Sequence, residues 1–319
     1  MYQWAKRHED LRKGFNADQI ERNAIRNNRS SFEFSVSDET ISDELPDLMR
    51  ETEGDQLFQK RDLVSEDIVG GAMEVLESRS QDLGELYPFR ISPGGIELIE
   101  SKKSNSWIYR FCLFASLADD LSEARKLRAS FELIALEAVA AFVGSGARGM
   151  RTGYPWDIYS HKFKNAKEVF AKLRTDCQDA LDWTWSAIEE LPDEPSSASA
   201  KDLGLDVVVW KGMPDSKGGN KYFLGQCATG KSDLEGKSHD LSIGRLRQWM
   251  RLPDTEATRT FIVPFYILSD VHVRELARSG GLVFDRSRIV KLLAKTNWIS
   301  EANFKDCQEL VKVVEITTL

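Results

Sequence analysis

A helical spacing of apolar side chains is clearest between Leu121 and Phe142. They recur there at intervals of three and four residues, which predicts an amphipathic helix, and Gly144 follows as a stop signal. The same spacing predicts a second helix over about residues 165–191, before a Pro- and Ser-rich cluster breaks the pattern. The apolar face of the first helix consists of Phe131, Ile134, Ala135, Ala138, Ala141 and Phe142.

Short β-branched and apolar runs predict strands in the second half of the chain. Residues 205–210 and 221–227 flank a turn rich in Gly, Pro and Asp, which is typical of a β-hairpin. A further strand is predicted over residues 261–268, where Pro264 interrupts the run and favours an edge strand or a bulge.

The remaining pattern mixes helices with loops. Amphipathic helices are predicted over residues 241–252, 275–293 and 304–314, the last with a closing strand as the alternative. Residues 107–117 are apolar enough to be buried, but their periodicity does not choose between helix and strand. Residues 37–55 are acidic and contain few large apolar side chains, which predicts a surface loop.

The alternation of helices and strands indicates an α/β protein. With 319 residues, the chain exceeds the usual domain size of about 100 to 200 residues. We therefore expect two parts: a mostly helical region over residues 1–120 that regulates or binds partners, and an α/β domain over residues 121–319.

Charge is distributed unevenly along the chain. The net charge is −8, but residues 38–85 hold 15 acidic against 4 basic side chains, a balance of −11, so the remainder sums to +3. The C-terminal part can therefore approach a phosphate backbone, although no pronounced basic patch is visible in the sequence.

The scattered cysteines and histidines argue against several classes of site. Cys112, Cys177, Cys227 and Cys307 form no C-x-x-C pair, so neither a zinc site nor a disulfide framework is indicated, and a Ser/His/Asp or Cys/His catalyst has little support. No apolar run approaches the roughly 20 residues of a membrane span, and the first residues lack the apolar core of a signal peptide. We expect a cytoplasmic protein without a membrane partner.

The strongest functional signal lies on the predicted hairpin. Asp206 opens the apolar run Val207, Val208, Val209, and Gln226 ends the returning strand. An acid at the head of a buried strand is costly unless it is paired or holds a metal ion. Phosphodiester hydrolysis needs oxygen ligands that hold Mg²⁺ or Mn²⁺ against the scissile phosphate, and two antiparallel strands present such groups side by side. The hairpin therefore predicts a metal-dependent nuclease site.

The same region also fits a different chemistry. Residues 225–232 match G-x-x-x-x-G-K-[ST], the phosphate-binding loop of P-loop NTPases. That loop needs its lysine and serine at the start of a helix, where free N–H groups bind phosphate. The segment after Lys231 contains Asp233 and Gly236 and has no apolar face, so it makes a poor helix. We keep the NTPase as an alternative and favour the nuclease.

The run 204–210 followed by residues 223–227 resembles the restriction-endonuclease-like PD-(D/E)XK nuclease superfamily. The resemblance covers about residues 125–270 and implies a mixed sheet flanked by helices, with an acid on an opening helix, an aspartate on one strand and (E/Q)-x-K on the next. Glu132 stands at the matching place of the opening helix, and Glu137 is the second choice. A function in restriction or bacterial anti-phage defence is implied by analogy only.

The resemblance implies a role for each candidate residue. Asp206, Gln226 and the main-chain carbonyl of Cys227 would bind Mg²⁺ or Mn²⁺, and Glu132 would hold a second metal ion or the attacking water. Lys231 would position the nucleophile and offset developing charge, since its long stem can reach back to the site. The substrate implied is DNA, with RNA as the alternative.

Two positions depart from the family pattern. Ala228 occupies the place of the family's lysine, three residues before Lys231, and Gln226 contributes a neutral carbonyl oxygen in place of a charge. A catalytically degenerate nuclease fold that binds DNA or assembles with other proteins is therefore an alternative function. The weak basic character also leads us to expect a helicase or ATPase partner that loads the protein onto DNA.

Overall fold

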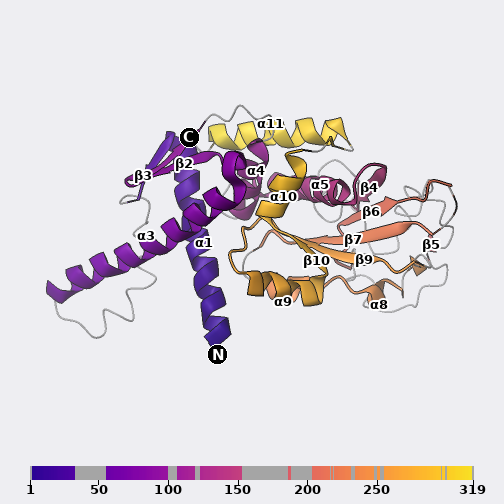
Figure 1. Cartoon of the computed structure of the whole chain (residues 1–319), viewed down its shortest axis with the longest axis horizontal. Coiled ribbons are helices and arrows are strands. Elements are labelled where there is room, and N and C mark those ends of the chain that lie inside the picture. Colours follow the sequence, from indigo (N-terminus) through magenta and orange to yellow (C-terminus); the bar gives the residue numbers. More distant parts are fainter. Residues whose placement is uncertain are drawn as a thin grey trace.

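The computed structural model describes residues 2–32, 55–99, 106–118, 123–152, 186–187, 203–215, 217, 219–230, 234–247, 250–251, 255–295, 297–298 and 300–317. The N-terminal part combines two long helices with a small antiparallel sheet of order β1-β3-β2 (Figure 1). Its elements are α1 (Tyr2–Asn27), β1 (Arg29–Ser31), α3 (Asp55–Leu83), the 3₁₀ turn η1 (Gly84–Leu86), β2 (Phe89–Ser92) and β3 (Gly95–Leu98).

A five-stranded mixed sheet occupies the C-terminal part. Its order is β10-β9-β7-β6-β4, and β6 runs antiparallel to both of its neighbours, whereas β7, β9 and β10 are parallel. The predicted hairpin is confirmed as the β6–β7 pair. The strands are β4 (Ala147–Arg151), β6 (Val207–Lys211), β7 (Lys221–Cys227), β9 (Thr258–Ile262) and β10 (Leu282–Phe284).

Helices cover both faces of this sheet (Figure 1). On one face, α5 (Ala124–Val143) packs against β6 and β7, with α4 (Trp107–Ser116), α10 (Arg286–Leu293) and α11 (Glu301–Thr317) around it. On the other face, α9 (Asp270–Gly280) packs against β9, next to the short helices α7 (Leu234–Ser238) and α8 (Ile243–Leu246).

Two apolar clusters fill the space on either side of the sheet. The larger joins α1, α3, α4, α5, α10 and α11 and includes Val207 and Val209 of β6. The smaller packs Phe261 of β9 against Leu276 of α9 and Leu234 of α7. Because alternate residues of a strand point to opposite faces, β9 and β10 each supply residues to both clusters.

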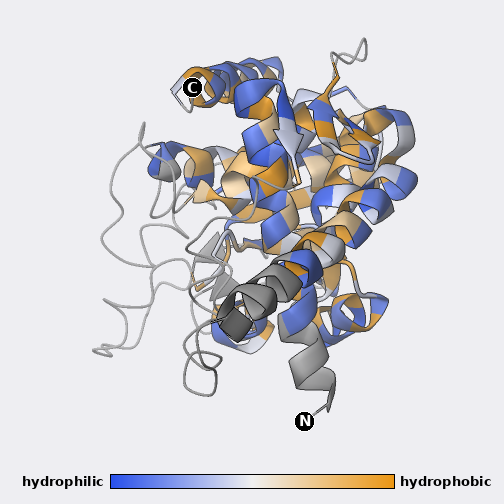
Figure 2. Cartoon of the chain, turned by 90° about the vertical axis from the view of Figure 1, so that its left-hand side faces the viewer, coloured by the Kyte–Doolittle hydropathy of each residue, from blue (hydrophilic) through white to orange (hydrophobic). Residues whose placement is uncertain are grey.

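Burial decides the form of the apolar run at residues 107–117. It folds as α4, whose residues are almost all fully buried, so a helix that is apolar all round becomes the centre of the larger cluster. Hydrophobic residues gather on the elements in the middle of the molecule, and the helices at its edge are banded in both colours (Figure 2). None of the described helices combines the length and apolar character needed to cross a bilayer.

The larger cluster also takes residues from both predicted parts, from Ala17 in α1 to Val314 in α11. The division of the chain at residue 120 stays a prediction. The predicted helix at 121–142 is confirmed as α5, which ends at Gly144 with a positive φ of 91°.

The predicted single helix over residues 275–293 is wrong, because a strand divides it. α9 ends at Gly280, and Gly281 turns the chain with φ of 88° into β10. A Cβ on Gly280 would lie 2.7 Å from the Cβ of Phe261, so only glycine lets the end of α9 approach β9 this closely.

The strand predicted over residues 261–268 lies earlier, at Thr258–Ile262, and is central instead of an edge strand. It ends before Pro264 because proline has no N–H to continue the ladder. The Pro264 carbonyl instead accepts a hydrogen bond of 2.9 Å from the Nε of Arg286.

Two further helix predictions need correction. Among the described residues of 241–252, Ile243–Leu246 is helical, and Met250–Arg251 forms strand β8, which pairs with β5 (Ser186–Ala187). β5 falls inside the helix predicted at 165–191, whose other residues lie outside the described part. Residues 33–54, which hold almost all of the predicted acidic loop, also lie outside it. At the C-terminus the predicted helix is confirmed as α11.

Candidate functional site

Asp206 lies directly before β6, beside the end of β7. Its backbone N–H donates to the carbonyl of Gly225 (2.9 Å), and its Oδ2 accepts the N–H of Cys227 (2.6 Å). These two contacts lie on either side of Gln226. The carboxylate is therefore fixed by the neighbouring strand, at the same end of the hairpin as the amide.

Gln226 is buried, with 4% of its surface exposed, and both ends of its amide are engaged. Nε2 donates to Oδ2 of Asp240 (3.4 Å), and Oε1 accepts the N–H of Leu241 (3.2 Å). The turn that follows α7 thus folds back onto the end of β7. This hydrogen bonding is the structural role that a buried amide needs, and it leaves the second lone pair of Oε1 for another donor or a cation.

Asp240 is a candidate that the sequence did not indicate. Its carboxylate is exposed, and it lies between Gln226 and Gly204, where a Cβ on Gly204 would come within 3.2 Å of the Cβ of Asp240. Gly204 has φ of 77°, so glycine suits this close approach. Asp240 follows a short polar segment without periodicity, and only its tertiary contact with Gln226 marks it.

Glu132 lies on α5, which packs on the face of the sheet that Val207 and Val209 occupy. It is 3% exposed and forms an ion pair with Arg151 at the end of β4 (3.8 Å). Arg151 lies opposite Val207 in the sheet, and the next residue, Thr152, donates its N–H to the carbonyl of Asp206 (2.8 Å). Arg151 therefore connects α5 to the strand that pairs with β6.

Glu137, the second choice on this helix, lies elsewhere. Its Oε1 accepts hydrogen bonds from the N–H of Ser300 (3.2 Å) and from Nδ2 of Asn303 (3.3 Å). These contacts hold the start of α11 against α5, which is a structural role.

Ala228, at the position where the resemblance implies a lysine, has apolar surroundings. Ala228 is 2% exposed and packs in the smaller cluster with Leu234. Lys231 lies outside the described residues. Lys237, in α7, is exposed and stands three residues before Asp240.

The structure also shows which elements surround residues 225–232, the match to the phosphate-binding loop. Gly225 lies within β7, paired with Val207 on one side and Thr260 on the other. The strand includes the first three residues of the motif, and the next described helix, α7, has five residues and begins at Leu234. This context differs from the strand, loop and long helix that cradle a phosphate.

Oxygen donors dominate the corner formed by Asp206, Gln226 and Asp240. Within the described ranges, no group of three or more His, Cys, Asp or Glu side chains is placed to hold a metal ion. Mg²⁺ is usually bound through one or two carboxylates together with substrate phosphates, so two aspartates and an amide oxygen fit this mode of binding.

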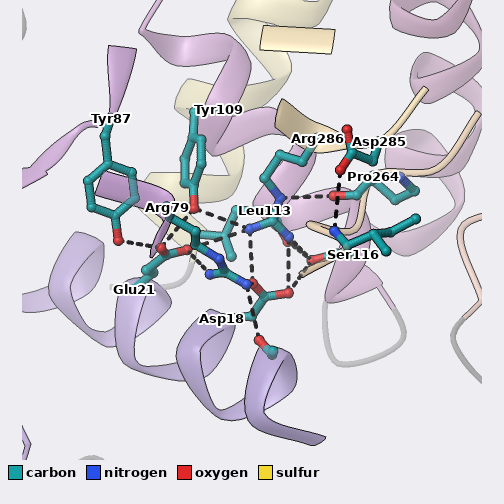
Figure 3. Close-up of polar contacts among 12 residues, drawn as sticks. Asp18, Glu21, Arg79, Tyr87, Tyr109, Leu113, Ser116, Pro264, Asp285 and Arg286 are labelled. Atoms are coloured by element: carbon teal, nitrogen blue, oxygen red, sulfur yellow. Dashed lines mark hydrogen bonds and ion pairs between the residues drawn. The ribbon is translucent and has the colours of Figure 1, made fainter. Parts of the chain in front are cut away.

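A second polar cluster, which the sequence pattern did not reveal, lies buried between α1, α3, α4 and α10 (Figure 3). Arg286 is fully buried and forms a bidentate pair with Asp18 (2.9 and 3.0 Å), while its Nη2 also donates to Oγ of Ser116 (2.9 Å). Its backbone N–H bonds the carbonyl of Phe265 (2.9 Å). The arginine therefore ties α1 to the loop that follows β9.

A second arginine completes this cluster. Arg79 of α3 pairs with Asp18 (2.8 Å) and with Glu21 (2.9 Å), and Tyr87 and Tyr109 donate to Oε1 of Glu21 (2.6 and 2.7 Å). Burial raises the pKa of both tyrosines, so each stays protonated and acts as a donor. Two guanidinium groups thus balance two carboxylates away from solvent.

A polar pocket of about 340 Å³ lies between α7 and α9. It contains a hydrogen bond between the hydroxyls of Ser238 and Ser279 (2.5 Å). Its lining consists of Glu235, Ser238, His239, Glu275, Leu276, Arg278 and Ser279.

Comparison of the chain with models of protein families, with curated proteins and with solved structures finds no match.

Proposed function

We propose that this chain is a metal-dependent nuclease that hydrolyses DNA phosphodiester bonds at the corner where β4, β6 and β7 end. The observation that carries the proposal is the position of Asp206 and Gln226 side by side at one end of an antiparallel hairpin. An opening helix, an aspartate and then an amide, in that chain order, are what the resemblance to PD-(D/E)XK nucleases implies. A mixed sheet with helices on both faces agrees with it.

Mg²⁺ or Mn²⁺ would be held by Asp206, Asp240 and the amide oxygen of Gln226, with the main-chain carbonyl of Cys227 as a further donor. When bound, such an ion polarises the phosphate and makes water a stronger nucleophile. Hydrolysis forms a bond between the water oxygen and phosphorus and breaks the bond to the leaving sugar oxygen, which takes up a proton from solvent as the attacking water gives one up.

The chain itself supplies orientation and charge. The N–H of Cys227 fixes the Asp206 carboxylate, and Nε2 of Gln226 donates to the Asp240 carboxylate. Arg151 balances the charge of Glu132, which would hold water or a second ion. A preorganised arrangement of this kind lowers the cost of reorganisation during the reaction.

The cation that positions the nucleophile is assigned to Lys231, with Lys237 of α7 as the second candidate. Ala228 is buried among apolar side chains, so a lysine at that position would lose its hydration. Lys237 follows Leu234, which packs with Ala228 in the same cluster, by one turn of α7.

The first test is cleavage of plasmid DNA with Mg²⁺ or Mn²⁺ by the wild type and by Asp206→Asn. Asparagine keeps an acceptor for the N–H of Cys227 but removes the charge, so the fold should persist while the rate falls on the order of 100-fold or more. Asp215→Asn, at an exposed loop aspartate between β6 and β7, is the matched control and should cleave like the wild type. Equal cleavage by Asp206→Asn and the wild type would reject the assignment.

A degenerate nuclease fold that binds DNA is the second candidate function. It is favoured by Ala228, whose buried apolar setting replaces a catalytic cation, and by the Gln226 amide, which is already hydrogen-bonded. DNA binding that is insensitive to EDTA, with no cleavage under either metal ion, would establish it. Thermal stabilisation by ATP or GTP that disappears in Lys231→Ala would instead support the NTPase.

Two further parts of the proposal rest on the resemblance and on charge. They are a role in restriction or phage defence, which follows from the resemblance, and loading onto DNA by a helicase or ATPase partner, which follows from charge. A cytoplasmic location is also proposed, from the absence of a signal-peptide pattern in the first residues. RNA remains the alternative substrate, and parallel cleavage assays on RNA separate the two.

A further inference from the structure

The segment after Asp240 places two arginines beside the candidate site. Leu241 is bound to the amide of Gln226, and α8 begins two residues later, with Ser242 as its N-cap. From extended and helical rises per residue, Arg245 lies within about 10 Å of Leu241. Arg245 and Arg247 are both exposed.

Packing explains why these two side chains point outward. Leu246 is fully buried, so the residues on either side of it are directed toward solvent. Neither guanidinium forms an ion pair or a side-chain hydrogen bond with another residue of the described part of the chain. Unpaired arginines that present a planar set of donors are well suited to bind phosphate.

The segment is held in place by a third arginine. Arg259 of β9 donates from Nη1 to the carbonyl of Leu241 (3.3 Å), while the N–H of Leu241 binds Gln226. Arg259 therefore fixes the turn between Asp240 and the segment that carries Arg245 and Arg247. Leu241, which is held by Gln226 and Arg259, thus joins Asp240 to the segment with the two exposed arginines.

We propose that Arg245 and Arg247 bind the phosphate backbone of a nucleic acid and thereby seat the scissile bond at Asp206. This inference rests on the proposed function for the identity of the site, and it adds the surface that contacts the substrate. The whole chain carries a net charge of −8 and repels polyanions, so binding needs local positive charge. Two carboxylates at the corner increase that need, because they repel an approaching phosphate.

The test measures binding in EDTA, where no metal-dependent cleavage occurs. Fluorescence anisotropy of a labelled DNA duplex, and of RNA with the same sequence, gives Kd over a range of KCl concentrations for the wild type and for the double variant Arg245→Ala/Arg247→Ala. Loss of two phosphate contacts should raise Kd at least about tenfold and reduce the slope of log Kd against log salt by about 2.

Two controls separate charge from folding. Arg245→Lys/Arg247→Lys keeps both charges and should retain most of the affinity and the salt slope. Arg90→Ala removes an exposed arginine of β2 that pairs with Glu97 (3.7 Å), and it should bind like the wild type. Unchanged melting temperatures across these variants confirm that folding is intact.

The outcomes distinguish this inference from the proposed nuclease. An unchanged Kd and salt slope in the double alanine variant would overturn the inference, as would a wild type that binds neither DNA nor RNA. Weaker binding by that variant on either polymer supports it, whatever Asp206→Asn does to cleavage. Loss of cleavage in Asp206→Asn with undiminished binding by the double variant would leave the nuclease standing and the arginine surface refuted.

Discussion

At the residue scale, the candidate site depends on side chains that are held by backbone groups. Cys227 fixes Asp206, and Leu241 fixes Gln226, so the geometry of the corner follows from where two chain segments meet. Asp206 was predictable, because an acid that opens a run of valines stands out in any sequence. Asp240 was not, because an exposed aspartate after a polar turn has no local signature.

Gly225 offers a test at the same scale. A Cβ there would lie 2.3 Å from Cγ2 of Val207 and 2.9 Å from Cδ1 of Ile262, so Gly225→Ala should lower the free energy of unfolding by about 1–3 kcal/mol. Urea denaturation measures the change. At Gly230 a Cβ would meet no atom within 4 Å, and Gly230→Ala serves as the control. Equal stability of the two variants would contradict the packing of β7. In a separate measurement of ATP or GTP binding, a loss in Gly230→Ala would favour the phosphate-binding loop.

At the element scale, caps and breaks decide where helices begin. α10 starts at an N-cap, Asp285, whose Oδ1 accepts the N–H of Arg288 (3.1 Å) and whose Oδ2 accepts that of Ile267 (3.3 Å). Asp285 lies inside the stretch that the sequence predicts as one helix, 275–293. Its role as an N-cap is visible only once β10 is seen to separate α9 from α10. Short strands next to helices are hard to predict because a few apolar residues satisfy both periodicities.

The pKa of Asp285 gives a pH-dependent prediction for α10. Burial raises this pKa above 3.8, although the hydrogen bonds from Arg288 and Ile267 oppose the rise. The folded state therefore holds the proton more tightly than the unfolded state, and this contribution to stability is present below 3.8 and lost as pH rises through the folded pKa. Urea titrations from near that pH to neutrality should show the stability advantage of the wild type over Asp285→Asn shrinking as pH rises. Parallel pH profiles would contradict this.

At the scale of the whole molecule, a buried network connects the N-terminal helices to the segment that follows β9. Asp18 of α1 and Arg286 of α10 are separated by 268 positions, and Arg286 also binds the carbonyl of Pro264 after β9. β9 in turn receives the N–H of Ala228 on the carbonyl of Ile262 (3.0 Å). The N-terminal helices thereby support the strand next to the candidate site.

Breaking this network should destabilise the entire protein. Arg286→Ala leaves Asp18 and Glu21 buried with less compensation, so the free energy of unfolding should fall by about 3–5 kcal/mol. Asp18→Ala and the double variant complete a cycle in which the double change costs less than the sum of the single ones. Arg90→Ala, at an exposed pair, should cost less than about 1 kcal/mol. A loss that small in Arg286→Ala, measured by urea denaturation, would show that the network carries little stability.

The sequence by itself determined the features that depend on near neighbours: the helix α5, the hairpin of β6 and β7, and the presence of Asp206 and Gln226 at its end. Periodicity and turn composition are patterns of a few neighbouring residues, so they can be recognised in the sequence before the fold is known. Tertiary structure alone decided that α9 and α10 are separated by a strand, that Asp240 meets Gln226, and that Arg286 is paired with Asp18. These contacts join distant segments, and their free energy comes from burial and charge compensation that exist only once the chain has folded.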